Sequence, residues 1–457
     1  MNKLRPVGGS LPLLATAVGF FQAFALGAAP SLTVQEVAQD PDTAVVTVSY
    51  KLADEPAVVT VDIQTNAGGN VWASIGGAHQ QHWAGDVNRL VAPSDEKVRK
   101  ATWIADVDWP GFVLDGSKAR AVVKVWPQDD PPDYMVVDGT APTNVCYYAG
   151  EEFLPLGVTN RLYKTDCYLL RRIHAANVVW LMGSPTSEKG RGTASNEGLH
   201  PVKLTADYYL GVYPVTQFQW KRVTNKNQSV FLSGNDPLLH PIENVTWGAV
   251  RGGDWVADGH DNLSASSFMS VLRKRTGVKF DLPTSAQWEY ACRAGTMSSL
   301  YTGESPSYTA IDGGDYSEET DAIAWNYHNN ATDPDCVTNS QGFTTHIVGK
   351  KPANPWGLYD MLGNTWDMCL DWYATDVPVS TELQVDPTGP AQAMSSGDLR
   401  GHVWRGGDSA VHRAGSYLRA ARNYTYGDNS STFGCLGFRL SCPVSAIGCF
   451  VNEGGAQ

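Results

Sequence analysis

The chain has 457 residues and a formal net charge of −13 at pH 7, from 34 Lys and Arg against 47 Asp and Glu. This length suits two or three domains, and a hydrophobic share of 42% excludes wholesale disorder. The acidic balance, without any run of five or six basic residues, argues against nucleic-acid binding. Gly and Pro number 45 and 26, and Trp numbers 15. These counts predict a loop-rich fold filled by large aromatic side chains.

Residues 1–29 have the layout of a secretory signal peptide. Lys3 and Arg5 supply a positive start, Leu11–Ala25 carries no charge, and small residues follow. The apolar run is shorter than the roughly 20 residues that span a bilayer. We therefore expect cleavage, and a protein that is secreted or periplasmic and has no membrane span.

Eight cysteines are present, and none forms a Cys-x-x-Cys pair. The spacing argues against a zinc ribbon or a thioredoxin-like motif. In an oxidising compartment some cysteines should form disulfides. Cys146 with Cys167, and Cys442 with Cys449, are candidates because they are close in sequence, but sequence does not determine the connectivity.

Residues 30–140 are predicted to form a β-sandwich of immunoglobulin or fibronectin type. Apolar and polar residues alternate over 44–50, 57–63 and 121–126, which is the pattern of half-buried strands. Turn residues near 138–142 mark the end of this domain, and we expect a linker over 141–167.

A second domain is predicted over 168–445, followed by a tail over 446–457. Its strongest helix signal begins at Thr284 or Ser285, either of which can cap the first turn. A second helical spacing covers 264–276. Short strands and long loops occupy most of the remainder, so the whole chain is predicted to be α+β.

Five segments of the second domain, taken in order, resemble the formylglycine-generating enzyme family, also called sulfatase-modifying factor. These segments are residues 209–220, 240–247, 282–295, 356–367 and 404–407, and the last is followed by the short motifs 420–422 and 437–439. The resemblance implies a C-type-lectin-like fold with little regular structure, many Trp and Gly residues, and loops held by ions.

The resemblance also implies a calcium site in the loop Leu362-Gly-Asn-Thr-Trp-Asp367. Leu362, Gly363 and Thr365 would offer backbone carbonyls, and Asp367 would offer its carboxylate. Similar family members have Glu at this last position, so the shorter Asp weakens the site. The alternative is a turn in which Asp367 accepts hydrogen bonds from backbone amides.

A second calcium site would fall at Asn326 and the loop that follows it. Asp333 and Asp335 are nearby carboxylates, and carboxylates are ligands that calcium prefers. Their spacing by itself is weak evidence.

Active family members have two cysteines between the Arg-Gly-Gly and Ala-Ala-Arg motifs. Those thiols bind copper, at which oxygen is activated and a sulfatase cysteine is oxidised to formylglycine. Residues 408–419 of this chain contain no cysteine. Val411 stands at the first position, and the second falls at Gly415 or Ser416. None of these side chains binds Cu(I) usefully, so copper is not expected as a cofactor.

The family groove would be lined by Arg405, Asp408, Ser409, His412, Arg413 and Ser416. We expect an exported, noncatalytic or divergent family member that binds a peptide or glycan of an exported protein in this groove. Two alternatives stay open: a copper-dependent oxidase that acts on a sulfatase cysteine, and a calcium-stabilised structural scaffold. The missing cysteine pair separates the binding module from the oxidase. Loss of stability on chelation, without any ligand binding, would be the signature of the scaffold.

Overall fold

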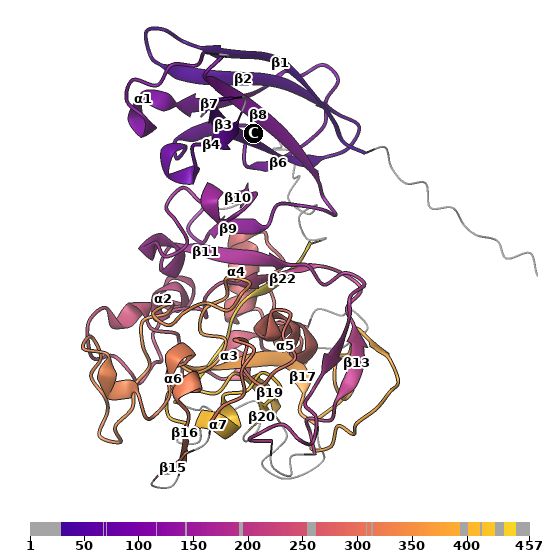
Figure 1. The fold of residues 1–457 in the computed structure, drawn as a ribbon, viewed down its shortest axis with the longest axis vertical. Coiled ribbons are helices and arrows are strands. Elements are labelled where there is room, and N and C mark those ends of the chain that lie inside the picture. Colours follow the sequence, from indigo (N-terminus) through magenta and orange to yellow (C-terminus); the bar gives the residue numbers. More distant parts are fainter. Residues whose placement is uncertain are drawn as a thin grey trace, which may run out of the picture.

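The computed structural model describes residues 29–444 except 67, 70, 116, 142–143, 192–194, 254–261, 308, 312–313, 394–400, 412–413 and 426–433. The protein is α+β, as predicted. An N-terminal β-sandwich is followed by a larger domain of short strands, short helices and long loops (Figure 1).

Two four-stranded sheets face each other in the sandwich. One has the order β1 (Ser31–Gln39), β2 (Val45–Ala53), β7 (Arg99–Ile104) and β5 (Trp83–Gly85). The other contains β4 (Trp72–Ser74), β3 (Ala57–Asn66) and β6 (Arg89–Val91), with β8 (Ala119–Pro127) also paired to β3. Short helical turns lie at η1 (Gly77–His79) and α1 (Ala105–Asp108).

The three alternating segments of the sequence form β2, β3 and β8, so these predicted strands are confirmed. Alternation places every second side chain on one face of a strand. Val48 and Tyr50 of β2 and Val59 and Val61 of β3 are buried between the sheets, together with Trp103 of β7.

The sandwich ends earlier than predicted. β9 (Tyr134–Asp138) pairs with β10 (Val145–Tyr148) and with β11 (Cys167–Ile173), so both β9 and β10 belong to the second domain. The predicted linker 141–167 instead carries β10 and the turns η2 (Glu151–Phe153) and η3 (Arg161–Lys164). Alternation marks a strand but does not say which sheet it joins, and this is why the boundary was misplaced.

In the described part of the second domain, the strands form three sheets and a hairpin. The first sheet has the order β10, β9, β11, β14 (Tyr208–Gly211) and β22 (Ser441–Pro443). The second sheet has the order β20 (Asn423–Tyr424), β19 (His402–Arg405), β17 (Trp366–Trp372) and β21 (Leu436–Gly437). The third sheet has the order β12 (Val179–Met182), β13 (His200–Lys203) and β18 (Gln384–Val385). The hairpin consists of β15 (Thr309–Ile311) and β16 (Gly314–Tyr316). The helices are α2 (Gln217–Thr224), α3 (Trp247–Val250), α4 (Phe268–Thr276), α5 (Ser285–Arg293), α6 (Glu318–Ile323) and α7 (Ala414–Tyr417), with turns η4 (Pro237–Leu239) and η5 (Asn330–Thr332).

Both predicted helices are present. Thr284 is the N-cap of α5 and forms a capping box with Gln287, in which each side chain accepts a hydrogen bond from the other residue's backbone amide. α4 begins at Phe268, later than the start of its helical spacing, because Ser267 caps it. Gly277 ends α4 in the left-handed conformation, with φ of 75°.

The two domains pack directly against each other. The Tyr147 amide of β10 donates a hydrogen bond to the Asn88 carbonyl of the sandwich at 2.8 Å. Val58 of β3 lies in the same buried cluster as Met135 and Tyr147. β9 and β10 therefore form the surface on which the sandwich rests (Figure 1).

Cys146 and Cys167 are free thiols, so their predicted pairing is wrong. They lie on β10 and β11, which flank β9 on opposite sides. Two strand spacings separate them by about 10 Å, beyond the roughly 7 Å between Cα atoms that a disulfide can bridge.

Cys449 lies outside the described residues, as do the tail 446–457 and residues 1–28 of the predicted signal peptide. Within residues 29–444 where placed, no helix has both the length and the apolar character to cross a bilayer.

Candidate functional site

Arg405 joins three segments of the second domain. It ends β19, is 1% exposed, and donates from Nε and Nη2 to the Ser285 hydroxyl at 3.0 and 2.6 Å. Its Nη1 donates to Glu289 Oε2 at 3.0 Å and to the Ala421 carbonyl at 2.9 Å. Arg405 therefore ties β19 to α5 and to the Ala-Ala-Arg segment.

Glu289 is the anion at the centre of this arrangement. Its buried carboxylate also accepts hydrogen bonds from Arg293 Nε and from the Gly183 amide, each at 2.9 Å. Burial alone would raise the pKa of Glu289, but the charges of Arg293 and Arg405 lower it below the ordinary value. The carboxylate is thus held ionised between two guanidinium groups.

Asp408 and Ser409 are buried as well. Asp408 Oδ1 accepts a hydrogen bond from the Ala410 amide at 2.9 Å, and burial raises the pKa of Asp408 to about 7. The Ser409 carbonyl accepts from Asn330 Nδ2 at 2.6 Å, and its hydroxyl lies 3.9 Å from the Cys435 sulfur.

The six predicted groove residues are not assembled into one open groove by the described part of the chain. Arg405, Asp408 and Ser409 are all buried. Arg405 is on the lining of a cavity of about 100 Å³, whereas Asp408 and Ser409 are not on that lining. Contacts with partners far along the chain decide their burial, and loop composition does not reveal those contacts. His412 and Arg413 lie outside the described residues, and the Ser416 side chain, on α7, is not described.

A single described thiol lies beside the segment that lacks the cysteine pair. Cys435 is buried, and burial raises its pKa well above the ordinary value. Val411, at the first missing position, is partly buried and packs against the main hydrophobic cluster. The described residues of this region therefore present one protonated thiol.

The loop 362–367 packs between the Arg-Gly-Gly motif and the segment that contains Trp325. The Gly363 amide donates to the Gly406 carbonyl at 2.9 Å, and the Asn364 amide donates to the Trp325 carbonyl at 3.0 Å. Gly363 has φ of 77°, and a Cβ there would lie 2.3 Å from the Trp325 carbonyl oxygen. Only glycine fits this close approach.

Asp367 has one oxygen paired and one free. Its Oδ2 accepts hydrogen bonds from Trp288 Nε1 at 2.9 Å and from Arg439 Nε at 2.6 Å. Its Oδ1 is buried and has no hydrogen-bond partner among the described residues. A cation would satisfy this oxygen, whereas the Gly363 carbonyl already accepts a hydrogen bond from the Thr365 amide at 2.9 Å. The calcium site stays a prediction.

Asn326 is engaged within its own loop. Its Nδ2 donates to Asp321 Oδ1 at 2.7 Å, and its Oδ1 accepts from the His328 amide at 2.9 Å. The Asp333 carboxylate instead contacts Lys350 and His346. Asp335, the other nearby carboxylate, contacts Lys350 as well. Asn326 therefore has different partners from the two carboxylates, and the second calcium site stays a prediction.

The family described as "Sulfatase-modifying factor enzyme 1-like domain" matches residues 171–442. The chain belongs to this family. The family domain is similar to the formylglycine-generating enzyme of Mus musculus, with 27% identity over 248 residues that cover 53% of each chain. It is also similar to the serine/threonine-protein kinase pkn1 of Chlamydia caviae, with 30% identity over 231 residues, 45% of this chain and 30% of the kinase. A third relative is the chaperone protein LppX of Paenibacillus barcinonensis, with 28% identity over 203 residues, 37% of this chain and 64% of that protein.

The chain spans about half the length of the mouse enzyme and less than two thirds of the other two relatives. Among solved structures, Treponema denticola variable protein 1 matches with 25% identity and a TM-score of 0.44, over 60% of this chain and 95% of that one. PvdO from Pseudomonas aeruginosa matches with 20% identity and a TM-score of 0.40, over 61% and 95% of the two chains.

A cavity of about 100 Å³ lies next to Arg405 in the family domain. Met182, Trp372 and Val403 supply apolar walls, and Asn196 and His200 are polar groups on its lining. Its residues come from segments between 182 and 421, so no local sequence pattern could have indicated it.

A larger cavity, of about 250 Å³, lies where the sandwich meets β10 and η2. Trp83 and Trp126 line it together with Asp62, Gln80 and Lys124. No local sequence pattern indicates this cavity either, because it depends on how the two domains pack.

Proposed function

We propose that the protein is an exported family member that binds a peptide or glycan of another exported protein and does not oxidise cysteine. The observation that carries the proposal is the absence of cysteine from residues 408–419. Copper(I) chemistry in the family requires two thiolates, and Val411 with Gly415 or Ser416 supplies none.

Two further observations support a role other than oxidation. Cys435, beside this segment, is a single buried thiol and cannot replace a pair. The similar proteins carry names as different as formylglycine-generating enzyme, protein kinase and chaperone. Membership of a fold family by itself does not determine activity.

The cavity beside Arg405 is the best candidate for the ligand. Its lining combines apolar walls with a few polar groups, which is the usual character of a binding site. A peptide side chain or a sugar ring could enter it with both apolar and hydrogen-bonding contacts. The charge of Glu289 is already balanced by Arg293 and Arg405, so these groups support the cavity without needing the ligand.

An oxidation assay tests the catalytic half of this proposal. The protein is incubated with copper, oxygen and a peptide that carries the Cys-x-Pro-x-Arg motif, and the peptide is analysed by mass spectrometry. We expect the peptide cysteine to remain unchanged. The variant Val411→Cys with Ser416→Cys, and its counterpart with Gly415→Cys, test whether returning the thiols restores copper binding. Formylglycine formed by the wild-type protein would refute the proposal.

A binding assay tests the other half. Wild-type protein is applied to a panel of glycans and to the same peptide with Ser in place of Cys. Val377→Trp fills the cavity from its half-buried lining position, whereas Val379→Trp changes an exposed residue of the same loop outside the lining. Binding that is lost in Val377→Trp and kept in Val379→Trp supports the cavity. Binding that is unaffected by Val377→Trp places the ligand elsewhere.

We also propose that the loop 362–367 binds calcium. The carbonyls of Leu362, Gly363 and Thr365 and the free Oδ1 of Asp367 are the donors, and oxygen donors suit this ion. Bound calcium would supply positive charge that fixes the loop between Trp325 and Gly406. The unpaired buried oxygen of Asp367 is what supports the proposal.

A further inference from the structure

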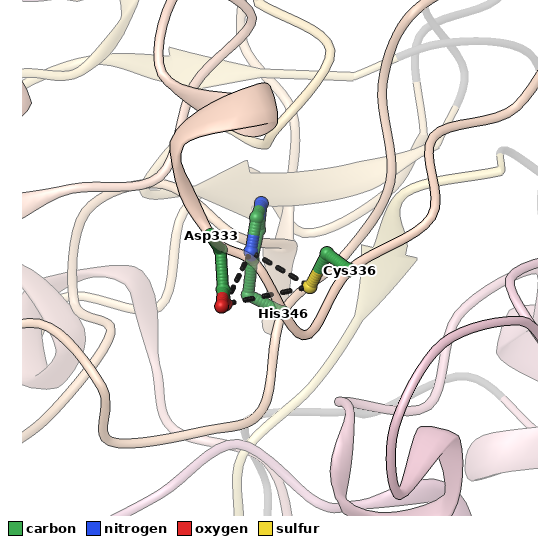
Figure 2. A group of neighbouring side chains, drawn as sticks. All are labelled: Asp333, Cys336 and His346. Carbon is green, nitrogen blue, oxygen red and sulfur yellow. Dashed lines mark hydrogen bonds and ion pairs between the residues drawn. The ribbon is translucent and has the colours of Figure 1, made fainter.

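Three side chains with metal-binding atoms converge in the loop that leads from η5 toward β17. His346 Nδ1 lies 3.1 Å from Asp333 Oδ2 and 3.1 Å from the Cys336 sulfur, which in turn lies 3.4 Å from Asp333 Oδ2 (Figure 2). Asp333 and His346 are buried, and Cys336 is half-buried. A carboxylate oxygen, an imidazole nitrogen and a sulfur thus point at one another.

The amide of Asn330 determines which nitrogen of His346 carries its proton. Asn330 Nδ2 donates to the Ser409 carbonyl at 2.6 Å, and Oδ1 accepts from the Thr344 amide at 3.3 Å. These two backbone partners set the orientation of the amide. The 2.9 Å contact between Asn330 Oδ1 and His346 Nε2 therefore requires a proton on Nε2. Nδ1 is the ring nitrogen that faces Asp333 and Cys336.

Few donors serve the three converging atoms. The Cys336 thiol has one proton, which can serve Nδ1 or Oδ2 but not both. Lys350 donates to both Asp333 oxygens, at 2.9 and 3.1 Å. Three atoms that can bind a metal ion thus lie within 3.4 Å of one another.

We propose that Asp333, Cys336 and His346 bind a divalent transition-metal ion of the zinc class, with a fourth position open to water. A cation between the three atoms would accept a lone pair from each of them. Tetrahedral zinc with these donors separates them by roughly 3.3–3.6 Å. The observed separations of 3.1 to 3.4 Å need to widen by only a few tenths of an ångström.

The charges of the cluster match a dication. Metal binding releases the thiol proton of Cys336 to solvent, after which the thiolate and the Asp333 carboxylate balance two positive charges. Lys350 now contacts both Asp333 oxygens, at 2.9 and 3.1 Å, and is 28% exposed. Its ammonium also contacts Asp335 Oδ2 at 2.7 Å, so Asp335 can retain Lys350 when the ion occupies the cluster.

The donor set favours a transition metal over calcium, because sulfur and imidazole nitrogen are poor ligands for hard cations. The surroundings already orient the histidine: Asn330 holds Nε2, and the Trp325 ring stacks on the imidazole at 3.8 Å. Outer contacts of this kind accompany histidine ligands in metal sites. Through Asn330 the cluster is also joined to Ser409, two residues before Val411.

Cobalt and zinc titrations of the metal-free full chain, made without a polyhistidine tag, test the site. We expect one equivalent of Co²⁺ to produce a thiolate-to-cobalt charge-transfer band in the near ultraviolet, and Zn²⁺ to displace it. Cys336→Ser is expected to remove the band and to weaken Zn²⁺ binding at least roughly 100-fold. Cys146→Ser alters a half-buried thiol outside the cluster and is expected to change neither. A wild-type protein without the band, or a band that persists in Cys336→Ser, would overturn the site.

A second measurement needs no variant. N-ethylmaleimide labelling of the wild-type protein, followed by peptide mapping, reports the accessibility of the Cys336 thiol. Zn²⁺ is expected to slow labelling of Cys336 at least tenfold, roughly in step with site occupancy, whereas Ca²⁺ leaves the rate unchanged. Equal labelling rates with and without Zn²⁺ would contradict the proposal.

Discussion

Four arginines have fully buried side chains in the described part of the family domain, and each pairs with a carboxylate. Arg251 pairs with Asp281, Arg405 with Glu289, Arg419 with Glu197, and Arg439 with Asp367. Arg405 and Arg439 belong to the Arg-Gly-Gly and Gly-Phe-Arg motifs that indicated the family. These motif residues therefore serve the fold by joining loops whose backbones make few regular contacts.

Glu289→Gln tests this structural role. The substitution leaves Arg293 and Arg405 without their buried counter-charge, and we expect it to lower the free energy of unfolding by about 3–5 kcal/mol. Denaturant titration of the wild type and variant measures the difference. Glu304→Gln removes an exposed carboxylate of the same domain and should change stability by less than about 0.5 kcal/mol. Equal effects of the two substitutions would contradict the role assigned to Glu289.

Asp408 makes stability depend on pH. Burial raises its pKa from 3.8 to about 7 in the folded chain, so its contribution is complete below pH 3.8 and is lost as the pH rises toward 7. Asp408→Asn removes this titration and should raise the free energy of unfolding at pH 8, relative to the wild type, by up to about 4 kcal/mol. Denaturant titrations at pH 5 and pH 8 measure it. A difference between variant and wild type that does not grow with pH would count against the buried, ionisable Asp408.

Among the elements, α5 does the most to position the candidate site. Its first turn presents Ser285 to Arg405 and Asp371, and its middle presents Trp288 to Asp367 and Glu289 to Arg405. The Thr284 capping box determines where the helix starts, and hence which way these side chains face.

Thr284→Ala removes the side chain that accepts the hydrogen bond of the Gln287 amide. We expect it to lower the free energy of unfolding by about 1 kcal/mol, while Thr284→Ser, which keeps the hydroxyl, should cost much less. Thermal and denaturant unfolding measure both variants. An equal loss in the two would show that packing of the methyl group, and not the cap, explains the effect.

At the scale of the whole molecule, two bound ions are proposed at different places. Calcium at the loop 362–367 and zinc at Asp333, Cys336 and His346 would each stabilise the folded chain by mass action. The proposed calcium-stabilised scaffold and the binding module share this property, so stability alone does not choose between those functions.

The thermal midpoint in the presence of each ion separates the two sites. We expect calcium at about 100 times its dissociation constant to add about 2.7 kcal/mol of stability, which EGTA removes. Cys336→Ser should keep this calcium effect and lose the zinc effect. Calorimetry or circular dichroism gives the midpoints. If adding calcium to the chelator-treated protein leaves the thermal midpoint unchanged, the loop site is refuted.

The sequence by itself determined the local structure, the family and the missing thiols. Alternation indicated β2, β3 and β8, a capping residue at Thr284 or Ser285 indicated α5, and ordered motifs indicated the family. Each of these signals is carried by neighbouring residues. Tertiary structure decided what depends on distant contacts. It placed β9 and β10 in a sheet of the second domain and buried Arg405, Asp408 and Ser409. It also formed two cavities between segments that are remote in sequence. It also brought Cys336 and His346 to Asp333. Their loop has no periodicity, and only the packing of Asn330, Trp325 and Lys350 around it makes their side chains converge.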